Sequence, residues 1–302
     1  MSVEDDSRFV MQVLRLNVLN ACYLFVLASV ILGIITIFWT WTNNISRKPP
    51  HKKSPDEVKL ALPRKTDLKH LTQSKLASLY HSYISTLQFG CGNIIRLGEE
   101  ADGGWEVCDD IIYRPEASCL VYSFGIDNDF SFDDSVALRF GCEVHSFDPS
   151  MNMDERQRKQ NVWFHPYAIG PETKVQRGNK WHMFTIPDLK KMLGHKERAL
   201  ALLKLDVEEW EMFVLPKLIM DGTLQTLRQL LVEFHITTRP EPNKERYIQG
   251  LEILIDLYNM GFRIFWTRRN LFCRFTSMKD DIERTGCHEV SFVNINRKNT
   301  HL

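Results

Sequence analysis

An alternation of continuous apolar segments with helical segments, beginning near residue 119, constrains the fold of this chain more than any other feature. Such apolar runs predict strands that are buried on both faces, as in a parallel sheet covered by helices. The last two predicted strands follow each other too closely for a helical crossover, so they predict an antiparallel pair at one edge. The expected fold class is therefore α/β, with a mostly parallel sheet and an antiparallel edge. The predicted strands are residues 119–126, 142–148, 162–170, 199–207, 227–236, 262–270 and 288–295, and the predicted helices are residues 131–140, 209–222 and 244–261.

Residues 18–41 form an uncharged stretch of 24 residues. As a helix it would be about 36 Å long, enough to cross a hydrocarbon core of about 30 Å. The stretch is longer than the apolar region of a cleaved signal peptide. We therefore expect one transmembrane helix at residues 18–41, after a short tail at residues 1–17. A stem at residues 42–70, rich in Pro, Lys and Arg, then leads to a domain at residues 71–302.

The sequence leaves open on which side of the membrane the domain lies. Arg47, Lys48, Lys52 and Lys53 follow the span, which favours a cytoplasmic domain by the positive-inside rule. Six cysteines outside the span suit disulfides in a lumenal compartment, with buried free thiols as the alternative. They are Cys91, Cys108, Cys119, Cys142, Cys273 and Cys287, of which the first two are close in sequence and the last two flank a predicted hairpin.

The ends of the predicted strands indicate where a ligand would bind. In open α/β sheets, ligands bind beyond the carboxyl ends of the strands, where the strand order reverses. The first strand ends at Ser123, Phe124 and Gly125, and the second ends at Asp148, 23 residues after Gly125. An acid at this position accepts hydrogen bonds from the ribose hydroxyls of an adenosine ligand. The alternative is a turn acid before Pro149.

The loop after the first strand is acidic where a phosphate-binding loop would be rich in glycine. Asp127 and Asp129 precede a helix whose expected N-cap is Ser131, with Asp133 and Asp134 in its first turn. These carboxylates would repel a diphosphate and attract a cation. S-adenosylmethionine combines a ribose with a sulfonium and an ammonium and has no phosphate, so it is the expected cofactor. Asp127 is the expected contact, while the two acids in the helix could simply cap it.

Seven segments of the chain resemble, in order, the methyltransferase-like protein 24 group. This group comprises S-adenosylmethionine-dependent class I methyltransferases with a Rossmann-like fold and, often, an amino-terminal membrane segment. The resemblance implies a cofactor loop at Ser123, Phe124, Gly125 and Asp127, and a ribose acid at Asp148. Asp127 stands where many class I methyltransferases have a second glycine. The segments are LGEEADGGWEVC, VYSFGIDNDFSFDDSVA, GCEVHSFDPS, LLKLDVEEWE, QLLVEFH, LYNMGFRIF and HEVSFVN.

Three further residues are candidates for the chemistry. Asp206 and Glu208 follow the fourth strand and His235 ends the fifth, so an acid–His pair could act as general base toward a hydroxyl or amine acceptor. Alternatively, Asp206 only orients the cofactor and Glu208 caps a helix. A metal held by Asp206, Glu208 and His235 is a further alternative, but no tight ligand motif supports it, and no metal is expected. Gly104, in a Gly pair before the first strand, could let the backbone approach the cofactor closely or belong to a simple turn.

Two other classes of protein fit parts of the sequence. Asp127, Asn128 and Asp129 match the metal motif of membrane-anchored glycosyltransferases, and a degenerate cofactor loop would also suit an inactive membrane-tethered binding module. A formal net charge of zero and a pI near 7.1 give no sign of the basic surface that nucleic-acid binding needs. The expected partners are thus a membrane and a methyl acceptor that the sequence does not identify.

Overall fold

The structure, a computed structural model, describes residues 62–100, 102–237 and 241–296. The expected tail, the expected transmembrane helix and most of the expected stem lie outside these residues. Within the described ranges no helix is both long and apolar enough to cross a membrane.

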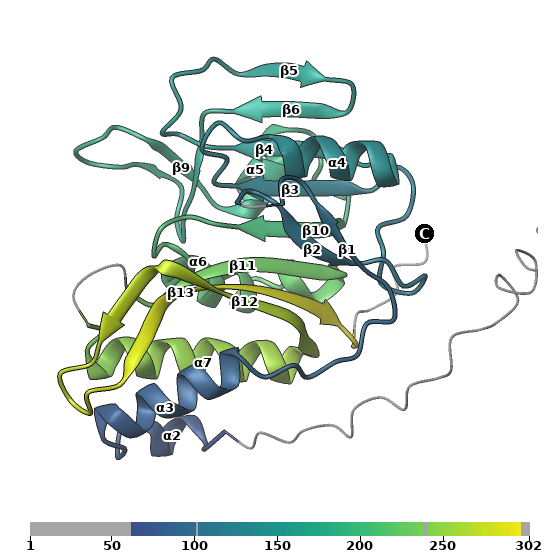
Figure 1. Cartoon of the computed structure of the whole chain (residues 1–302). Helices are drawn as coiled ribbons and strands as arrows, with labels where there is room; N and C mark the ends of the chain where they lie inside the picture. Colours follow the sequence, from purple (N-terminus) through teal and green to yellow (C-terminus); the bar gives the residue numbers. More distant parts are fainter. Residues whose placement is uncertain (1–61, 101, 238–240, 297–302) are drawn as a thin grey trace, which may run out of the picture. The chain divides into compact units, whose positions relative to one another are not determined.

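A mixed eight-stranded sheet organises the described residues, in the order β12-β13-β11-β10-β3-β4-β6-β5 (Figure 1). Five neighbouring strands, from β11 to β6, are parallel, and β13 and β5 run antiparallel to their neighbours. This confirms the expected α/β class with its mostly parallel sheet. The bounds are β3 Leu120–Phe124, β4 Glu143–Phe147, β5 Arg156–Lys159, β6 Val162–His165, β10 Leu200–Leu205, β11 Gln229–His235, β12 Phe262–Thr276 and β13 Glu283–Asn294.

The predicted antiparallel edge is present, and it is longer than expected. Strands β12 and β13 form a hairpin, and β13 lies between β12 and β11 in the sheet. The hairpin continues past the sheet because β12 reaches Thr276 and β13 begins at Glu283. Two smaller sheets complete the strands: β1 Ile94–Leu97 with β2 Trp105–Cys108, and β7 Ala168–Ile169 and β8 Lys174–Val175 on either side of β9 His182–Phe184.

Helices and the β1–β2 hairpin cover the two faces of the sheet. Alternate residues of each strand enter different cores: Leu203 and Leu205 pack with the helices of one face, whereas Leu202 packs with α4 and the hairpin on the other. This alternation follows from the two-residue period of a strand. The helices are α2 Lys65–Leu68, α3 Gln73–Ile84, α4 Ser131–Phe140, α5 Ile186–Met192, α6 Glu211–Met220 and α7 Lys244–Met260.

The core includes a short helix from the expected stem. In α2, Leu68 is fully buried and Lys65 forms an ion pair with Asp256 of α7 at 2.5 Å. Leu62, also in the expected stem, packs against the same core, so the polar composition of residues 42–70 did not predict these apolar contacts.

Three disulfides tie the described residues together: Cys91–Cys108, Cys119–Cys142 and Cys273–Cys287. The disulfide interpretation of the cysteines is the one that the structure supports. Cys119 and Cys142 immediately precede β3 and β4, so this bond joins the starts of two central strands. Cys273–Cys287 closes the β12–β13 hairpin.

Candidate cofactor site

The strand order reverses between β3 and β10, and a cavity of about 820 Å³ lies at the carboxyl ends of the strands there. From β3 the chain continues through α4 toward β4 on one side, whereas β10 leads to β11 on the other. This is the topological switch point, where ligands of doubly wound sheets bind. The volume suits a nucleoside-sized ligand.

Gly125 brings the backbones of β3 and β10 into contact at this point. Its φ is +79°, and a Cβ atom there would lie 1.7 Å from the carbonyl oxygen of Asp206. The ammonium of Lys204, buried beneath the loop, donates to the Gly125 carbonyl at 2.5 Å. Any larger residue would have to push the two strands apart, so the position admits only glycine.

Asp148 organises the loop after Gly125. Its Oδ2 accepts hydrogen bonds from the backbone N–H groups of Ile126 at 2.8 Å and Asp127 at 3.0 Å. Its Oδ1 accepts from the N–H and the hydroxyl of Ser150. Burial opposes ionisation, but these four hydrogen bonds outweigh it and lower the pKa of Asp148. The carboxylate therefore remains charged, and it borders the cavity.

The start of α4 differs from the expectation. The N-cap residue is Phe130, without a side-chain cap, so the prediction of Ser131 as N-cap is wrong. Asp129 supplies the capping interaction by accepting from the Ser131 N–H at 2.8 Å, and the Ser131 hydroxyl accepts instead from the N–H of Glu99. Asp134 makes ion pairs with Arg158 and with Lys159, away from the residues that line the cavity.

Three further predicted residues occupy distinct positions. Phe124 lines the cavity, whereas Ser123 is fully buried one residue earlier and is not part of the lining. Gly103 lines the cavity but Gly104 does not, because Gly104 packs under the backbone of Glu99, where a Cβ would lie 2.1 Å from the carbonyl oxygen. The Gly pair thus serves both close packing and the cavity wall.

Carboxylates dominate the cavity lining. Lys204 is the one Lys or Arg among the described lining residues, and its ammonium is directed at the Gly125 carbonyl. Burial raises the pKa of Asp133 and of Glu233, so the negative charge comes chiefly from the other lining acids; it repels phosphates and favours a cation. The lining carboxylates are Asp102, Asp127, Asp129, Asp133, Asp148, Asp206, Glu208 and Glu233.

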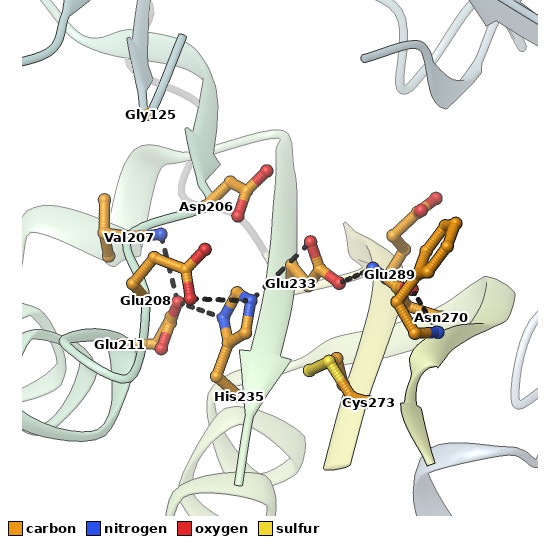
Figure 2. A network of polar contacts seen from close by, with 12 residues as sticks. Gly125, Asp206, Val207, Glu208, Glu211, Glu233, His235, Asn270, Cys273 and Glu289 are labelled. Atoms are coloured by element: carbon orange, nitrogen blue, oxygen red, sulfur yellow. Dashed lines mark hydrogen bonds and ion pairs between the residues drawn. A yellow bond between two sulfur atoms is a disulfide. The ribbon is translucent and has the colours of Figure 1, made fainter. Parts of the chain in front are cut away.

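The structure brings Asp206, Glu208 and His235 together at one end of the cavity, as predicted (Figure 2). The Nδ1 atom of His235 lies 2.9 Å from Oε1 of the fully buried Glu211. Its Nε2 atom faces Oε2 of Glu208 at 3.7 Å and Oε2 of Glu233 at 3.8 Å. Glu211 therefore fixes the His235 ring through Nδ1, and Nε2 faces the carboxylates of the cavity.

Two groups of this cluster have strongly shifted pKa values. Burial alone would lower the pKa of His235, but the hydrogen bond and charge of Glu211, together with Glu233 and Asp206, raise it to about 10. Burial and the nearby charge of Asp206 raise the pKa of Glu233 to about 7. At neutral pH His235 is thus an imidazolium, and Glu233 is the group poised to exchange a proton.

Glu233 was not among the predicted site residues. It lies on the same face of β11 as His235, two residues earlier, and its Oε1 accepts from Asn270 Nδ2 at 2.9 Å. A carboxylate within a run of apolar strand residues was the available signal. Cys287, although close to Glu233 and His235, is bonded to Cys273 and is not a thiolate ligand.

This sheet order, with an acid-lined cavity at the switch point, is the architecture of a Rossmann-like methyltransferase. The chain belongs to the methyltransferase domain family, which matches residues 48–294. The resemblance predicted from the sequence is thereby confirmed, as is S-adenosylmethionine as the cofactor of the class.

Two relatives have the name "Probable methyltransferase-like protein 24". The rat protein (Rattus norvegicus) is 28% identical over 240 residues, which cover 72% of this chain and 65% of the relative. The human protein (Homo sapiens) is 28% identical over 234 residues, which cover 70% and 63%. The chain thus aligns with somewhat less than two thirds of the length of these relatives.

Among solved structures the chain is similar to Streptococcus pneumoniae Sp1610 in complex with S-adenosyl-L-methionine. The identity is 10%, the alignment covers 62% of this chain and 71% of that one, and the TM-score is 0.27. A protein of the NADB-Rossmann superfamily from Streptococcus agalactiae has 11% identity, coverage of 62% and 66%, and the same TM-score. Such remote similarity assigns no role to any residue.

The contact between Gly125 and Asp206 predicts a large loss of stability in Gly125→Ala. Gly141→Ala is a matched control, because Gly141 has a similar φ of +68° but nothing within 4 Å of the place that a Cβ would take. The control should cost about 1 kcal/mol of unfolding free energy from backbone strain alone. Gly125→Ala should cost about 2 kcal/mol more because of the overlap. Equal losses in urea unfolding would contradict the contact.

The raised pKa of His235 predicts a pH-dependent stability. An unfolded histidine titrates near pH 6.5, whereas His235 in the fold titrates at about 10. Its contribution is therefore fully present below pH 6.5 and is lost as the pH rises toward 10. His235→Gln should flatten the dependence of the urea midpoint on pH in this window, whereas His182→Gln, at an exposed position of β9, should not. An unchanged slope in His235→Gln would contradict the shift.

Proposed function

We propose that the chain is a membrane-anchored methyltransferase that transfers a methyl group from S-adenosylmethionine to a hydroxyl or amine acceptor. The acid-lined cavity at the switch point carries this proposal, since it favours a cationic, phosphate-free nucleoside. Phe124, Gly125, Asp127 and Asp148 would hold the cofactor, which supplies an electrophilic methyl group when bound. Ser123 and Gly104 would support this loop from beneath rather than touch the cofactor.

The cluster around His235 would handle the proton of the acceptor. We assign the role of general base to Glu233, whose pKa of about 7 makes it half ionised at neutral pH. His235, protonated and hydrogen-bonded to Glu211, would position the carboxylates of Glu233 and Glu208. Asp206, beside the Gly125 contact, would keep the pKa of Glu233 high through its charge. Methyl transfer needs little else beyond in-line placement of the two reactants.

The side of the cavity away from the carboxyl ends of the strands would receive the acceptor. It combines aromatic side chains with the part of β12 where the pairing with β13 is irregular, and Phe272 there is 94% exposed. The aromatic lining residues that are not buried are Tyr167, Trp181, Trp210 and Phe272. Flat apolar surface beside carboxylates suits an uncharged or cationic acceptor and disfavours an anionic one.

A lumenal or extracellular position is the one that we propose for the domain, with residues 18–41 as a single-pass anchor. The three disulfides support this side, because disulfides persist in oxidising compartments. The basic residues after the span favour the opposite orientation. We give the disulfides more weight, because disulfides rarely persist in the cytosol.

Replacing Glu233 should separate catalysis from binding. In the full chain, purified in mild detergent and supplied with methyl-labelled cofactor and cell extract, Glu233→Gln should lower label transfer about 100-fold or more, the usual contribution of a general base. Cofactor binding measured by calorimetry should change little. Glu245→Gln, on the exposed first turn of α7, is the control and should transfer label as the unmodified chain does. A chain that binds cofactor yet transfers no label to any extract component would instead be a binding module.

The proposed compartment predicts that six cysteines are oxidised in cells. Alkylation with a maleimide–polyethylene glycol reagent should modify Cys91, Cys108, Cys119, Cys142, Cys273 and Cys287 only after reduction. In sealed microsomes the domain should also resist added protease until detergent is present. Digestion without detergent, with all six thiols reactive, would place the domain in the cytoplasm.

A further inference from the structure

A second cluster of titratable side chains lies away from the cofactor cavity, near the amino ends of the strands. Glu143 is the first residue of β4, and His145 follows it on the same face of the strand. His195 comes from the turn between α5 and β10, so two separate segments meet here. Both histidines are 5% exposed, and the Glu143 side chain is 29% exposed.

Three atoms of this cluster converge. Oε1 of Glu143 lies 3.0 Å from Nε2 of His145 and 3.0 Å from Nε2 of His195. All three atoms lie within 4.8 Å of one another. Two imidazole nitrogens and one carboxylate oxygen are the ligand set of many zinc sites, which leave a fourth position to water.

Each of these side chains is oriented by a further partner. The Nδ1 atom of His195 lies 2.8 Å from the hydroxyl of Tyr122, and the Nδ1 atom of His145 lies 2.8 Å from Nε2 of His165. The second oxygen of Glu143 accepts from Arg198 at 2.7 Å. Partners of this kind fix the direction of metal-binding imidazoles and carboxylates.

The proton positions in the series of hydrogen bonds from Glu155 through His165 and His145 favour a cation beside Glu143. The Glu155 carboxylate accepts from Nδ1–H of His165 at 2.5 Å, so a neutral His165 must accept at its Nε2. His145 then donates through Nδ1, which leaves a lone pair on its Nε2. This lone pair faces Oε1 of Glu143, itself an acceptor, at 3.0 Å. Two acceptors at that distance repel each other unless a positive charge lies between them.

We propose that Glu143, His145 and His195 bind one zinc ion, through Oε1, Nε2 and Nε2. The alternative positive charge is an extra proton on His145, with His195 donating its own Nε2–H to the same carboxylate oxygen, and measured zinc uptake distinguishes the two. The ion would join the start of β4 to the turn before β10. The partly exposed side of Glu143 leaves access for the ion and for a water ligand.

Metal analysis of the full chain tests this proposal. The protein, purified in mild detergent and stripped with a chelator, should take up about one zinc per chain and show a higher midpoint of thermal unfolding with zinc. Glu143→Gln and His195→Gln should lower the affinity for zinc at least ten-fold. Tyr122→Phe, which removes only the partner of His195, should weaken zinc about ten-fold, the effect expected of an outer partner.

Cobalt(II) provides a readout that does not depend on stability. In the unmodified chain it should produce visible absorption bands, and zinc should displace them, whereas Glu143→Gln should not produce them. His235→Gln, in the cofactor cavity, is the control that should keep both zinc and the cobalt bands. Zinc uptake equal in the unmodified chain and His195→Gln, or uptake lost only in His235→Gln, would overturn the site. These outcomes do not depend on methyl transfer.

Discussion

The close approach of the Gly125 backbone to the carbonyl oxygen of Asp206 is the constraint on which the cofactor site depends. It brings β3 and β10 together at the point where their connections diverge, and Lys204 reinforces it by binding the Gly125 carbonyl. On the other side of Gly125, Asp148 holds the same loop by accepting from the N–H groups of Ile126 and Asp127. The cavity lies beside this contact, and its lining also includes residues of β7, β9 and β12.

Charge gives this cavity its selectivity. The lining acids come from four strand ends and, in the case of Asp102, from the loop between β1 and β2. Hydrogen bonds lower the pKa of Asp148, and a backbone N–H holds Asp129 in place. Near His235, the same carboxylates shift the pKa values of the groups beside them. They make His235 an imidazolium and bring Glu233 to a pKa near neutrality. One excess of carboxylates can thus both attract a sulfonium and prepare a base.

The sequence predicted the features that depend on local pattern. Continuous apolar runs identified the strands, and the residues that end them identified Gly125, Asp148, Asp206 and His235. It failed where a side chain's partner is distant in sequence. Ser131 was expected to cap its own helix but bonds Glu99, and Glu233 looked like part of an apolar strand. The polar strands β5 and β8 and the cluster of Glu143, His145 and His195 follow from tertiary packing alone, which no local period records.

The central claim, that an acidic cavity selects a cationic nucleoside, is tested most directly by calorimetric titration of the full chain in detergent with S-adenosylmethionine and with NADH. We predict saturable one-to-one binding of S-adenosylmethionine that weakens as salt increases, and no binding of NADH at about a hundred-fold higher concentration. The double variant Asp127→Asn/Asp129→Asn should reduce this discrimination. Binding of NADH as tight as that of S-adenosylmethionine, or discrimination that the double variant leaves unchanged, would contradict the claim.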